Sequence, residues 1–460
     1  MTTQQITDYI KQHPSGKVKL AITDIDGVLR GKYVSTEKFF TVLEGRLGFC
    51  DVVFGWDMND AAYDNVKFTG WHTGYPDTPV QIDLDTFRKI PWENDLPFFL
   101  GDFIDEKNIP AAVCPRQLLR KITAQCEQEG FTPYFSQEFE WFNFSETPDS
   151  LQEKGFRNLT ALSPGMFGYS VLRSTLKNEF MTDLFELLKK FDIPLEGLHT
   201  ETGPGVYEAA IAYATILAAA DRAVLFKTAV KEIAYKHGIM ASFMAKWNEN
   251  LPGCSGHVHQ SLWDKKAGIN LFYDENDAHY MSPLMKHYLA GQLFCLPHIL
   301  PMYAPLINSY KRLVEGAWAP TTLTWGFDNR TVALRVLSSG KNSARLETRV
   351  VGSDTNPYLA MAACLASGMY GIRNKLELGQ PATTGNGYKD ITQGVLPRNL
   401  DEATQKMKQS SIANELFGSM FVEHFTLTRD WEWRQYSKTN TDTRSKAITD
   451  WELKRYFEIV

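Results

Sequence analysis

Two glutamates in residues 135–141 are spaced so that they could act on one ligand. A β-strand there would put Glu138 and Glu140 on one face and the intervening aromatic residues on the other. Carboxylate oxygens are the ligands that hard divalent metals prefer. A solvated strand face explains an isolated pair equally well, because surface carboxylates are common. The pair therefore predicts a metal site only if further ligands join it.

Two later segments could supply such ligands. In residues 199–208, Glu201 and Glu208 flank a Gly-Pro-Gly turn, and we expect Glu208 in the first turn of an Ala-rich helix. An acid in that position can serve the helix dipole alone, whereas Glu201 has no such role. Further along, His257 and His259 alternate behind a glycine-rich turn that lacks the spacing of a phosphate-binding P-loop. A histidine satisfied within the core is the alternative for either residue.

Arginines crowd the region that follows. Glu347 alternates with Arg349, so a strand would put both on one face. A guanidinium presents a planar fork of donors that fits phosphate and carboxylate groups, although surface salt bridges are the ordinary explanation of such a cluster. The arginines concerned are Arg312, Arg330, Arg335, Arg345 and Arg349.

Together these residues predict phosphoryl transfer. Carboxylates with one histidine suit Mg²⁺ or Mn²⁺, and their number suits two or more ions in one site. Arginine beside carboxylate-bound metal is typical of sites where positioning and charge neutralisation do most of the catalytic work. The expected metal ligands are Glu138, Glu140, Glu201, Glu208, His257 and Glu347.

The elements that must position these residues alternate between strand and helix. Residues 17–34 predict a strand, a turn at Gly27 and a second strand. Hydrophobic spacing predicts further strands near 131–144, 240–247, 255–262, 322–337 and 344–351. It predicts helices near 116–129, 173–191, 205–237, 355–377 and 400–416. This order is typical of an α+β fold, with a small sheet domain over 1–112 and a larger domain over 113–460.

Composition excludes several classes of function. The net charge of −6, without a basic run, argues against a nucleic-acid partner. The N-terminal residues lack the pattern of a signal peptide, and no apolar stretch has membrane-spanning length, so we expect a cytosolic protein with no membrane partner. The six cysteines lack C-x-x-C spacing, so we expect reduced, mostly core residues.

In its ordered motifs the chain resembles the bacterial type of glutamine synthetase over most of its length. Besides the segments above, these motifs are FMAKW from Phe243, GxxxHVHQSL from Gly253, NSYKRLV from Asn308, DNRT from Asp328, and ARLETR with NPYLA up to Ala360. Within that family it is closest in character to γ-glutamyl-amide ligases such as γ-glutamylanilide synthase. The resemblance implies a β-grasp N-terminal domain and a catalytic domain with a curved antiparallel sheet and flanking helices. It also implies a double-ring dodecamer with active sites between subunits.

The resemblance further implies a reaction and residue roles. L-glutamate and ATP would form γ-glutamyl phosphate, from which an amine expels phosphate. One metal would take Glu140, Glu201 and Glu208, and the other Glu138, His257 and Glu347. The substrate-binding positions would be Glu140, Gly253, His257, Arg312, Trp318 and Arg349, and the catalytic positions Asp57, Arg330, Arg335 and Arg349. The nucleotide would contact Tyr213, His259, Ser261, Arg335 and Arg345.

The sequence departs from the family where the amine should bind. Family members read R-L-V-P-G-x-E-A-P, but residues 312–320 read RLVEGAWAP, with Trp318 at the position of the acid and Glu315 replacing the proline. An indole cannot deprotonate ammonium, so we expect an organic amine larger than ammonia, with aniline or a related arylamine first, because arylamines arrive neutral. A packing replacement in an enzyme that still uses ammonia is the alternative for Trp318.

A second departure leaves the proton acceptor open. The family's D-G-S-S loop, which completes the ammonium site, is replaced by GWDMND over residues 55–60. An alkylamine such as isopropylamine, a polyamine or ammonia is the alternative substrate, with Asp57, Asp60 or Glu315 taking the proton.

Two other functions compete with ligation. Asp24 and Asp26 after an apolar strand resemble the nucleophile motif of haloacid dehalogenase-type phosphatases, although no later lysine and aspartate pair is evident. A non-catalytic structural relative is the other alternative. Such a relative should have lost metal ligands, whereas all the expected positions are occupied here.

Overall fold

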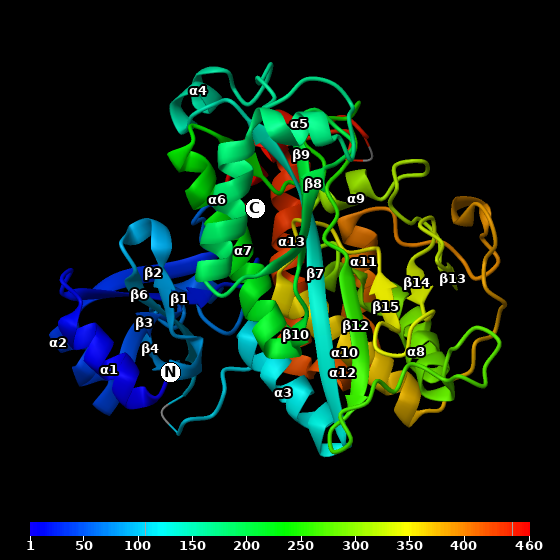
Figure 1. Ribbon diagram of the computed structural model, residues 1–460, viewed down its shortest axis with the longest axis horizontal. Helices are drawn as coiled ribbons and strands as arrows, with labels where there is room; N and C mark the ends of the chain where they lie inside the picture. The colour runs from blue at the N-terminus through cyan, green and yellow to red at the C-terminus, as the bar shows by residue number, and fades with distance from the viewer. Residues whose placement is uncertain (106, 444) are drawn as a thin grey trace.

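Two β-sheets with covering helices make up the protein, seen in a computed structural model that describes residues 1–105, 107–443 and 445–460. The smaller sheet has the strand order β2-β1-β6-β4-β3, with β5 paired to β6, and lies on the left of Figure 1. The larger sheet runs β13-β14-β15-β12-β7-β9-β8, with β10 and β11 also paired to β7. The predicted α+β class is confirmed.

The smaller sheet begins with the predicted hairpin. Its turn holds Gly27 at φ 85°, a left-handed conformation that costs glycine little. The strands are β1 (Lys17–Thr23), β2 (Leu29–Ser35), β3 (Leu47–Cys50), β4 (Asp77–Ile82), β5 (Arg88–Ile90) and β6 (Leu96–Phe103). The helices of this part are α1 (Thr3–Gln12) and α2 (Thr36–Glu44), and single 3₁₀ turns are η1 (Asp51–Phe54), η2 (Leu84–Thr86) and η3 (Pro91–Glu93).

The larger sheet is built around one long strand, β7 (Phe131–Phe144). Its side chains alternate as predicted: Phe139 is buried and stacks on Phe226 with ring centroids 5.6 Å apart, while Glu138 and Glu140 face the other side. The other strands are β8 (Leu195–Thr200), β9 (Val206–Ile211), β10 (Ala214–Thr215), β11 (Met240–Ser242), β12 (Val258–Asp264), β13 (Trp325–Phe327), β14 (Leu334–Leu337) and β15 (Arg345–Thr348). Apart from the parallel pair β13 and β14, the pairings are antiparallel.

Helices α3 (Pro115–Gln128), α7 (Ile216–Lys236) and α10 (Pro357–Arg373) pack against β7 of this sheet. The other helices of this part are α4 (Pro148–Glu153), α5 (Val171–Leu176), α6 (Asn178–Lys190), α8 (Pro283–Ile299), α9 (Ser309–Arg312), α11 (Leu400–Lys408), α12 (Ser411–Phe417), α13 (Ser419–Thr439) and α14 (Asp450–Tyr456), with 3₁₀ turns η4 (Leu300–Met302) and η5 (Gly387–Lys389). The sequence did not predict α8 or α13. The helix expected over 400–416 is broken, because Ser410 caps the start of α12.

The helix predicted from residue 205 is wrong over its first part. Residues Val206–Ile211 form strand β9, and the helix starts only at Ile216. Glu208 therefore lies on a strand and not in the first turn of a helix. The reason is pairing on both sides, because β9 lies between β7 and β8 and its side chains alternate between the core and the open face.

Buried ion pairs join the two sheets. Arg116 of α3 donates to Asp83 and Asp102 of the smaller-sheet region and to Asp221 of α7, over 2.6 to 2.9 Å. The main hydrophobic core also includes residues of the smaller sheet, such as Leu100. The division of the chain at residue 112 stays a prediction.

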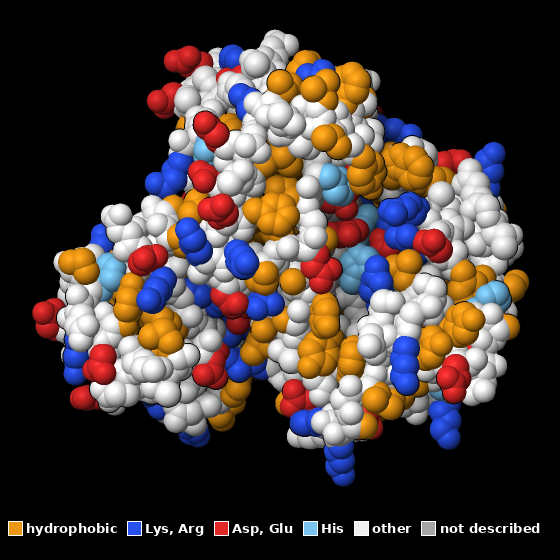
Figure 2. All heavy atoms as spheres, viewed as in Figure 1, with side chains coloured by type: hydrophobic (Ala, Val, Ile, Leu, Met, Phe, Trp, Pro, Cys, Tyr) orange, Lys and Arg blue, Asp and Glu red, His pale blue; other side chains and the backbone are white. Residues whose placement is uncertain are grey.

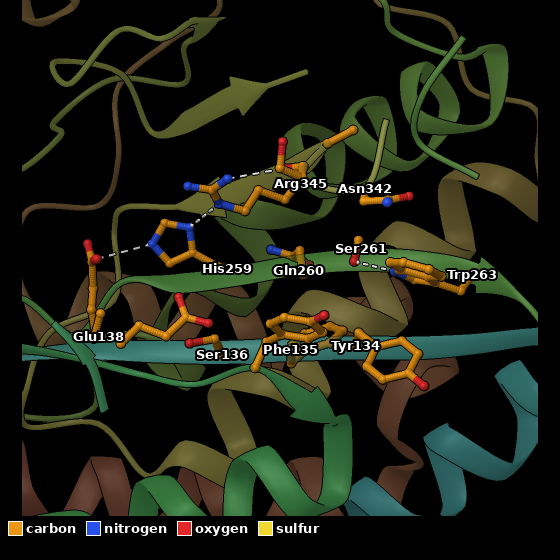
Figure 3. Close-up of a pocket in the computed structure, with 15 residues that line it drawn as sticks. Tyr134, Phe135, Ser136, Glu138, His259, Gln260, Ser261, Trp263, Asn342 and Arg345 are labelled. Atoms are coloured by element: carbon orange, nitrogen blue, oxygen red, sulfur yellow. Dashed lines mark hydrogen bonds and ion pairs between the residues drawn. The ribbon is translucent and has the colours of Figure 1, made fainter. Parts of the chain in front are cut away.

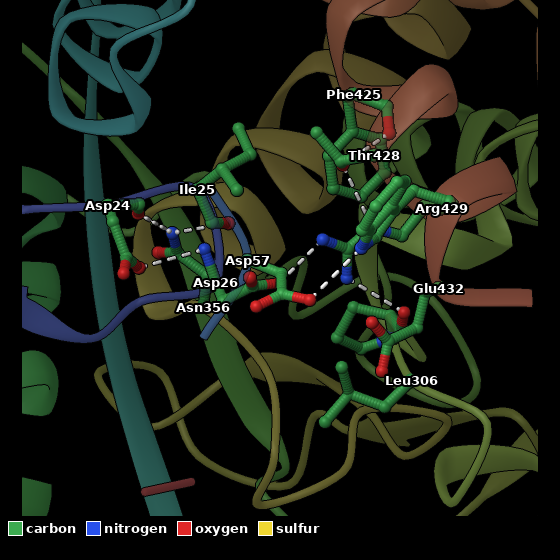
Figure 4. A network of polar contacts seen from close by, with 12 residues as sticks. Asp24, Ile25, Asp26, Asp57, Leu306, Asn356, Phe425, Thr428, Arg429 and Glu432 are labelled. Atoms are coloured by element: carbon green, nitrogen blue, oxygen red, sulfur yellow. Dashed lines mark hydrogen bonds and ion pairs between the residues drawn. The ribbon is translucent and has the colours of Figure 1, made fainter. Parts of the chain in front are cut away.

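The aspartates that resemble a phosphatase nucleophile are structural in this fold. The Asp24 carboxylate accepts from the backbone N–H of Asp26 and Val28 and from Arg30 at 2.9 to 3.0 Å. Asp26 forms a buried ion pair of 2.5 Å with Arg429 of α13, as Figure 4 shows. Within the described chain no cluster of potential metal ligands forms around them. The phosphatase interpretation finds no site here.

The cysteine expectation is met. All six thiols are free, and five of them are buried. No helix of the described residues combines the length and the apolar character needed to cross a membrane.

Buried His424 predicts a pH dependence of stability. Neither ring nitrogen has a hydrogen-bond partner among the residues that the structure describes, and burial with nearby Arg429 lowers its pKa to about 3. Because the unfolded chain takes up a proton near pH 6.5 that the folded chain refuses, stability falls as the pH drops below that value, by roughly 2 kcal/mol between pH 7 and pH 5. In urea unfolding, the free energy of unfolding of His424→Leu should fall by roughly 2 kcal/mol less than that of the wild type between pH 7 and pH 5. Equal losses in both proteins would contradict the prediction.

Candidate active site

Strand pairing brings the predicted acids to one face of the larger sheet. Glu140 on β7 lies opposite Glu208 on β9, which in turn lies opposite His199 on β8. On the other side of β7, His259 on β12 pairs with Glu347 on β15. Residues from five neighbouring strands thus gather over one surface, although they are far apart in the sequence.

Glu138 is the centre of the first group. Its carboxylate lies 2.8 Å from Nδ1 of His257 and 3.2 Å from Nε2 of His259. His257 Nδ1 is also 3.4 Å from Glu347, whose other oxygen accepts from Arg335 at 2.8 Å. Burial opposes ionisation of Glu138, but His259 and His257 hold its pKa well below the ordinary value. An ionised carboxylate between two imidazoles is ready to bind a cation.

Two groups beside Glu138 also have lowered pKa values, which favour an ionised Glu347 and a neutral His257. Burial tends to raise the pKa of Glu347, but Arg349 and the two imidazoles outweigh this and lower it to about 2. Burial and then Arg349 lower the pKa of His257 to about 4. A neutral imidazole keeps a free lone pair for a metal.

His199, Glu201 and Glu208 form the second group. The His199 nitrogens lie 3.7 Å from both carboxylates, and Tyr169 stacks on the imidazole with centroids 4.4 Å apart. Burial, followed by the charges of Glu138 and other acids, raises the pKa of Glu208 to about 10. Crowded acids of this kind are what a divalent cation relieves. His199 was not among the expected site residues, although the sequence shows its H-x-E spacing to Glu201.

These residues fit divalent metals. Potential ligand atoms lie within 4.8 Å of one another in two groups, Glu138 with His259 and Glu347, and His199 with Glu201 and Glu208. Among the described residues, Nε2 of His257 and one buried oxygen of Glu201 have no hydrogen-bond partner, while Nε2 of His259 faces the Glu138 carboxylate at 3.2 Å. The grouping differs from the expected sets, because Glu140 accepts from the backbone N–H of Ser255 at 2.6 Å and lies outside the tight groups.

A cavity of about 270 Å³ adjoins the first group. Of the five residues expected at the nucleotide, Tyr213, His259, Ser261 and Arg345 line this cavity, whereas Arg335 lines the neighbouring one. Figure 3 shows its two unlike ends: Glu138 and His259 lie at one, and Tyr134 and Trp263 at the other. The cavity is therefore charged at one end and aromatic at the other.

A second cavity of about 230 Å³ shares Glu138, His259 and Arg345 with the first. Arg330 and Arg335 line it together with members of the second acid group. In Figure 2 acidic, histidine and arginine side chains gather in this hollow, between β8 and β14. The expected catalytic residues Arg330 and Arg335 therefore both face the acid cluster.

The positions expected at glutamate also meet. A Cβ at Gly253 would lie 2.6 Å from the Ala245 carbonyl oxygen and 2.8 Å from Cγ of Arg312, so only glycine fits there. The Arg312 guanidinium donates to the carbonyls of Val350 and Arg349 at 3.2 and 3.3 Å.

Three predicted residues lie apart from this cluster within the chain. Asp57 is 2% exposed, accepts from Arg455 at 2.8 Å and from the Trp431 indole at 3.0 Å, and caps its own turn. Burial favours protonation, but Arg455 and Trp431 leave the pKa of Asp57 lowered. Asp60 is exposed and pairs with Arg30. Trp318 is 62% exposed in a left-handed backbone conformation, φ 58°.

Comparison with known proteins agrees with this geometry. A family model described as the glutamine synthetase catalytic domain matches residues 112–456. Type-1 glutamine synthetase 2 of Dictyostelium discoideum is 54% identical over 458 residues, which are 99% of this chain and 86% of that protein. Glutamate–isopropylamine ligase of a Pseudomonas species is 37% identical over 460 residues, 99% of this chain and 98% of the relative.

One further relative and one solved structure are also similar to this chain. Gamma-glutamylethanolamide synthetase GlnA4 of Streptomyces coelicolor is 35% identical over 442 residues, 96% of this chain and 92% of the relative. The solved structure of a GmaS/ADP complex has a TM-score of 0.82 at 24% identity and covers 98% of both chains, which shows the shared fold.

Proposed function

The chain belongs to the glutamine synthetase family of ATP-dependent carbon–nitrogen ligases, and from this premise we propose that it joins the γ-carboxylate of L-glutamate to an organic amine larger than ammonia. Aniline or a related arylamine is the first candidate, and an alkylamine is the second. One observation carries the proposal: a complete acid and arginine centre occurs together with an exposed tryptophan where the family has an acid.

The charged end and the aromatic end of the first cavity indicate how the nucleotide would be oriented in it. Tyr134 and Glu138 are four residues apart on β7, or about 13 Å at a strand's rise. An extended nucleoside triphosphate can span that distance, with its base against Tyr134 and Trp263 and its phosphates toward Glu138 and Arg345. Mg²⁺ or Mn²⁺ held by the two acid groups would neutralise the charge that accumulates on the phosphates.

The reaction then has two steps. A γ-carboxylate oxygen of glutamate attacks the γ-phosphorus of ATP, and the bond to the bridging oxygen of ADP breaks. The amine nitrogen next attacks the acyl carbon, loses a proton, and expels phosphate that carries one oxygen of the former carboxylate. We assign Arg330 and Arg335 to the transferred phosphoryl group, since both line the cavity beside the acids. Arg312 and Arg349 hold the glutamate.

The relatives support an organic amine and also name the second candidate. Two of them are named for isopropylamine and for the ethanolamide product, whereas the 54% identical relative is named a glutamine synthetase. Ammonia is therefore the alternative substrate. Comparison of kcat/KM for aniline, isopropylamine, ethanolamine, putrescine and ammonia separates these possibilities.

We also propose that the enzyme is a homo-oligomer, with a double-ring dodecamer expected. Support comes from the apolar side chains exposed along residues 166–176, because contiguous exposed apolar surface commonly marks a protein interface. Native mass spectrometry of the purified enzyme measures the number of subunits directly.

Substitution of Trp318 tests the amine pocket. In Trp318→Glu we expect kcat/KM for the preferred organic amine to fall by about 10- to 100-fold, because an aromatic wall is lost, while ammonia turnover rises. Tyr280→Glu is the matched control, since Tyr280 is also an exposed aromatic residue with a left-handed backbone, φ 57°. Unchanged turnover of the organic amine, with no gain for ammonia, would refute the pocket.

A further inference from the structure

The C-terminal helix α14 is tied to the segment that carries Arg312. We propose that Glu452 of α14 is a positioning residue for glutamate binding: through Lys311 and Asn308 it fixes α9 and so places the Arg312 guanidinium. This inference rests on the proposed function, because it takes Arg312 to bind the substrate carboxylate.

Glu452 makes an unusually complete set of contacts for a carboxylate that is 0% exposed. One oxygen accepts from the Asn308 amide at 2.9 Å. The other accepts from the Lys311 ammonium at 2.5 Å and from the backbone N–H and hydroxyl of Thr449 at 2.9 and 2.8 Å. Both oxygens are thus used within the protein, and none of these partners belongs to the acid cluster.

Asn308 links Glu452 to the backbone of Lys246. Its side chain accepts from the backbone N–H of Lys246 at 2.6 Å and donates to the Lys246 carbonyl at 2.7 Å. The next residue, Ser309, donates to Asp354 at 2.5 Å. The single turn of α9 is therefore held from three sides, by α14, by the segment after β11 and by the loop before α10.

Arg312 ends this turn. Its side chain is tightly packed, and its guanidinium forms no ion pair with a carboxylate of the described residues. The side chain lies within 2.8 Å of where a Cβ of Gly253 would stand, so a small shift of α9 would press it against the backbone. Its guanidinium is buried and donates to backbone carbonyls. Glu140 and Asp354 lie near enough to act on its charge, but neither is paired with it in the described chain. A buried guanidinium without a directly paired carboxylate is suited to receive a substrate carboxylate, provided that its position is fixed.

Lys311 and Asn308 belong to a motif that the proposed chemistry does not otherwise use. Both side chains donate to Glu452. The Arg312 side chain instead passes Gly253 with its aliphatic part and donates to the carbonyls of Arg349 and Val350. The motif therefore has two sides, an anchor toward α14 and a binding group toward the site.

Three variants test the inference in the full-length enzyme. Glu452→Gln keeps the acceptor for Asn308 but removes the charge that holds Lys311. The double variant Lys311→Met with Glu452→Leu removes both buried charges, so it restores folding stability without restoring the anchor. Glu423→Gln, which breaks a surface pair with Lys67, is the control. Glutamate binding is measured by calorimetry, with a non-hydrolysable ATP analogue and Mg²⁺ present, and kcat and KM by product formation.

We expect a roughly tenfold loss of glutamate affinity in Glu452→Gln and in the folded double variant, with KM for ATP unchanged. A double variant that is folded and binds glutamate like the wild type would show that Glu452 serves stability alone, and would overturn the inference. A wild-type enzyme that binds glutamate but forms no amide would contradict the proposed function and leave this test decisive. A wild-type enzyme that binds no glutamate would contradict both.

Discussion

Glu138→Gln should lower kcat of the ligase reaction by on the order of a thousandfold while the protein stays folded. Glu138 is the carboxylate that contacts both His257 and His259, and it lines both cavities. Its ionised state is the one favoured by the neighbouring imidazoles. Glutamine keeps the shape but cannot supply the negative charge that a divalent cation requires.

Metal affinity separates this explanation from a general loss of structure. Titration with Mn²⁺, followed by electron paramagnetic resonance, should show at least one site weakened or lost in Glu138→Gln. Glu186→Gln on the exposed face of α6 serves as the control and should match the wild type in both assays. Full Mn²⁺ binding with normal turnover in Glu138→Gln would remove Glu138 from the metal centre.

Arg116→Leu should lower the free energy of unfolding by about 3 to 5 kcal/mol. The Arg116 guanidinium donates to the carboxylates of Asp83, Asp102 and Asp221. Burial makes the loss of free energy large, because Asp102 and Asp221 have almost no contact with solvent. Removal of the cation leaves buried carboxylates without their main partner. The contacts that are lost lie at the junction between the smaller sheet and the helices of the larger one.

Arg434→Leu provides the comparison for this effect. Arg434 also pairs with an aspartate, Asp64, but both side chains are substantially exposed. Its loss should change the free energy of unfolding by less than about 1 kcal/mol. Similar values for the two variants, measured by urea unfolding, would show that the Arg116 cluster adds nothing beyond a surface pair.

Local patterns predicted much of this fold. The alternation in β7 correctly put Glu138 and Glu140 on one face, and the first hairpin was predicted from its apolar first strand and the turn at Gly27. The failure at Glu208 has a tertiary cause: an Ala-rich segment has high helix propensity, but pairing with β7 and β8 on both sides outweighs it.

The composition of the site was predictable only in part. Acids, histidines and arginines were identified, but which of them meet depends on cross-strand register, so His199 was missed and His259 joins Glu138 and Glu347. The amine side was the least predictable. Asp57 fills a buried role with Arg455, a residue nearly four hundred positions away, which no local pattern could indicate.

The most direct test of γ-glutamyl ligation follows one oxygen atom. Glutamate labelled with heavy oxygen in its γ-carboxylate is incubated with the enzyme, ATP, Mg²⁺ and the preferred amine, and phosphate and amide are examined by mass spectrometry. The expected result is one labelled oxygen in the released phosphate and one in the γ-glutamyl amide, since the acyl phosphate passes a carboxylate oxygen to phosphorus. Unlabelled phosphate, or phosphate release without any amide across the amine panel, would contradict the proposed reaction.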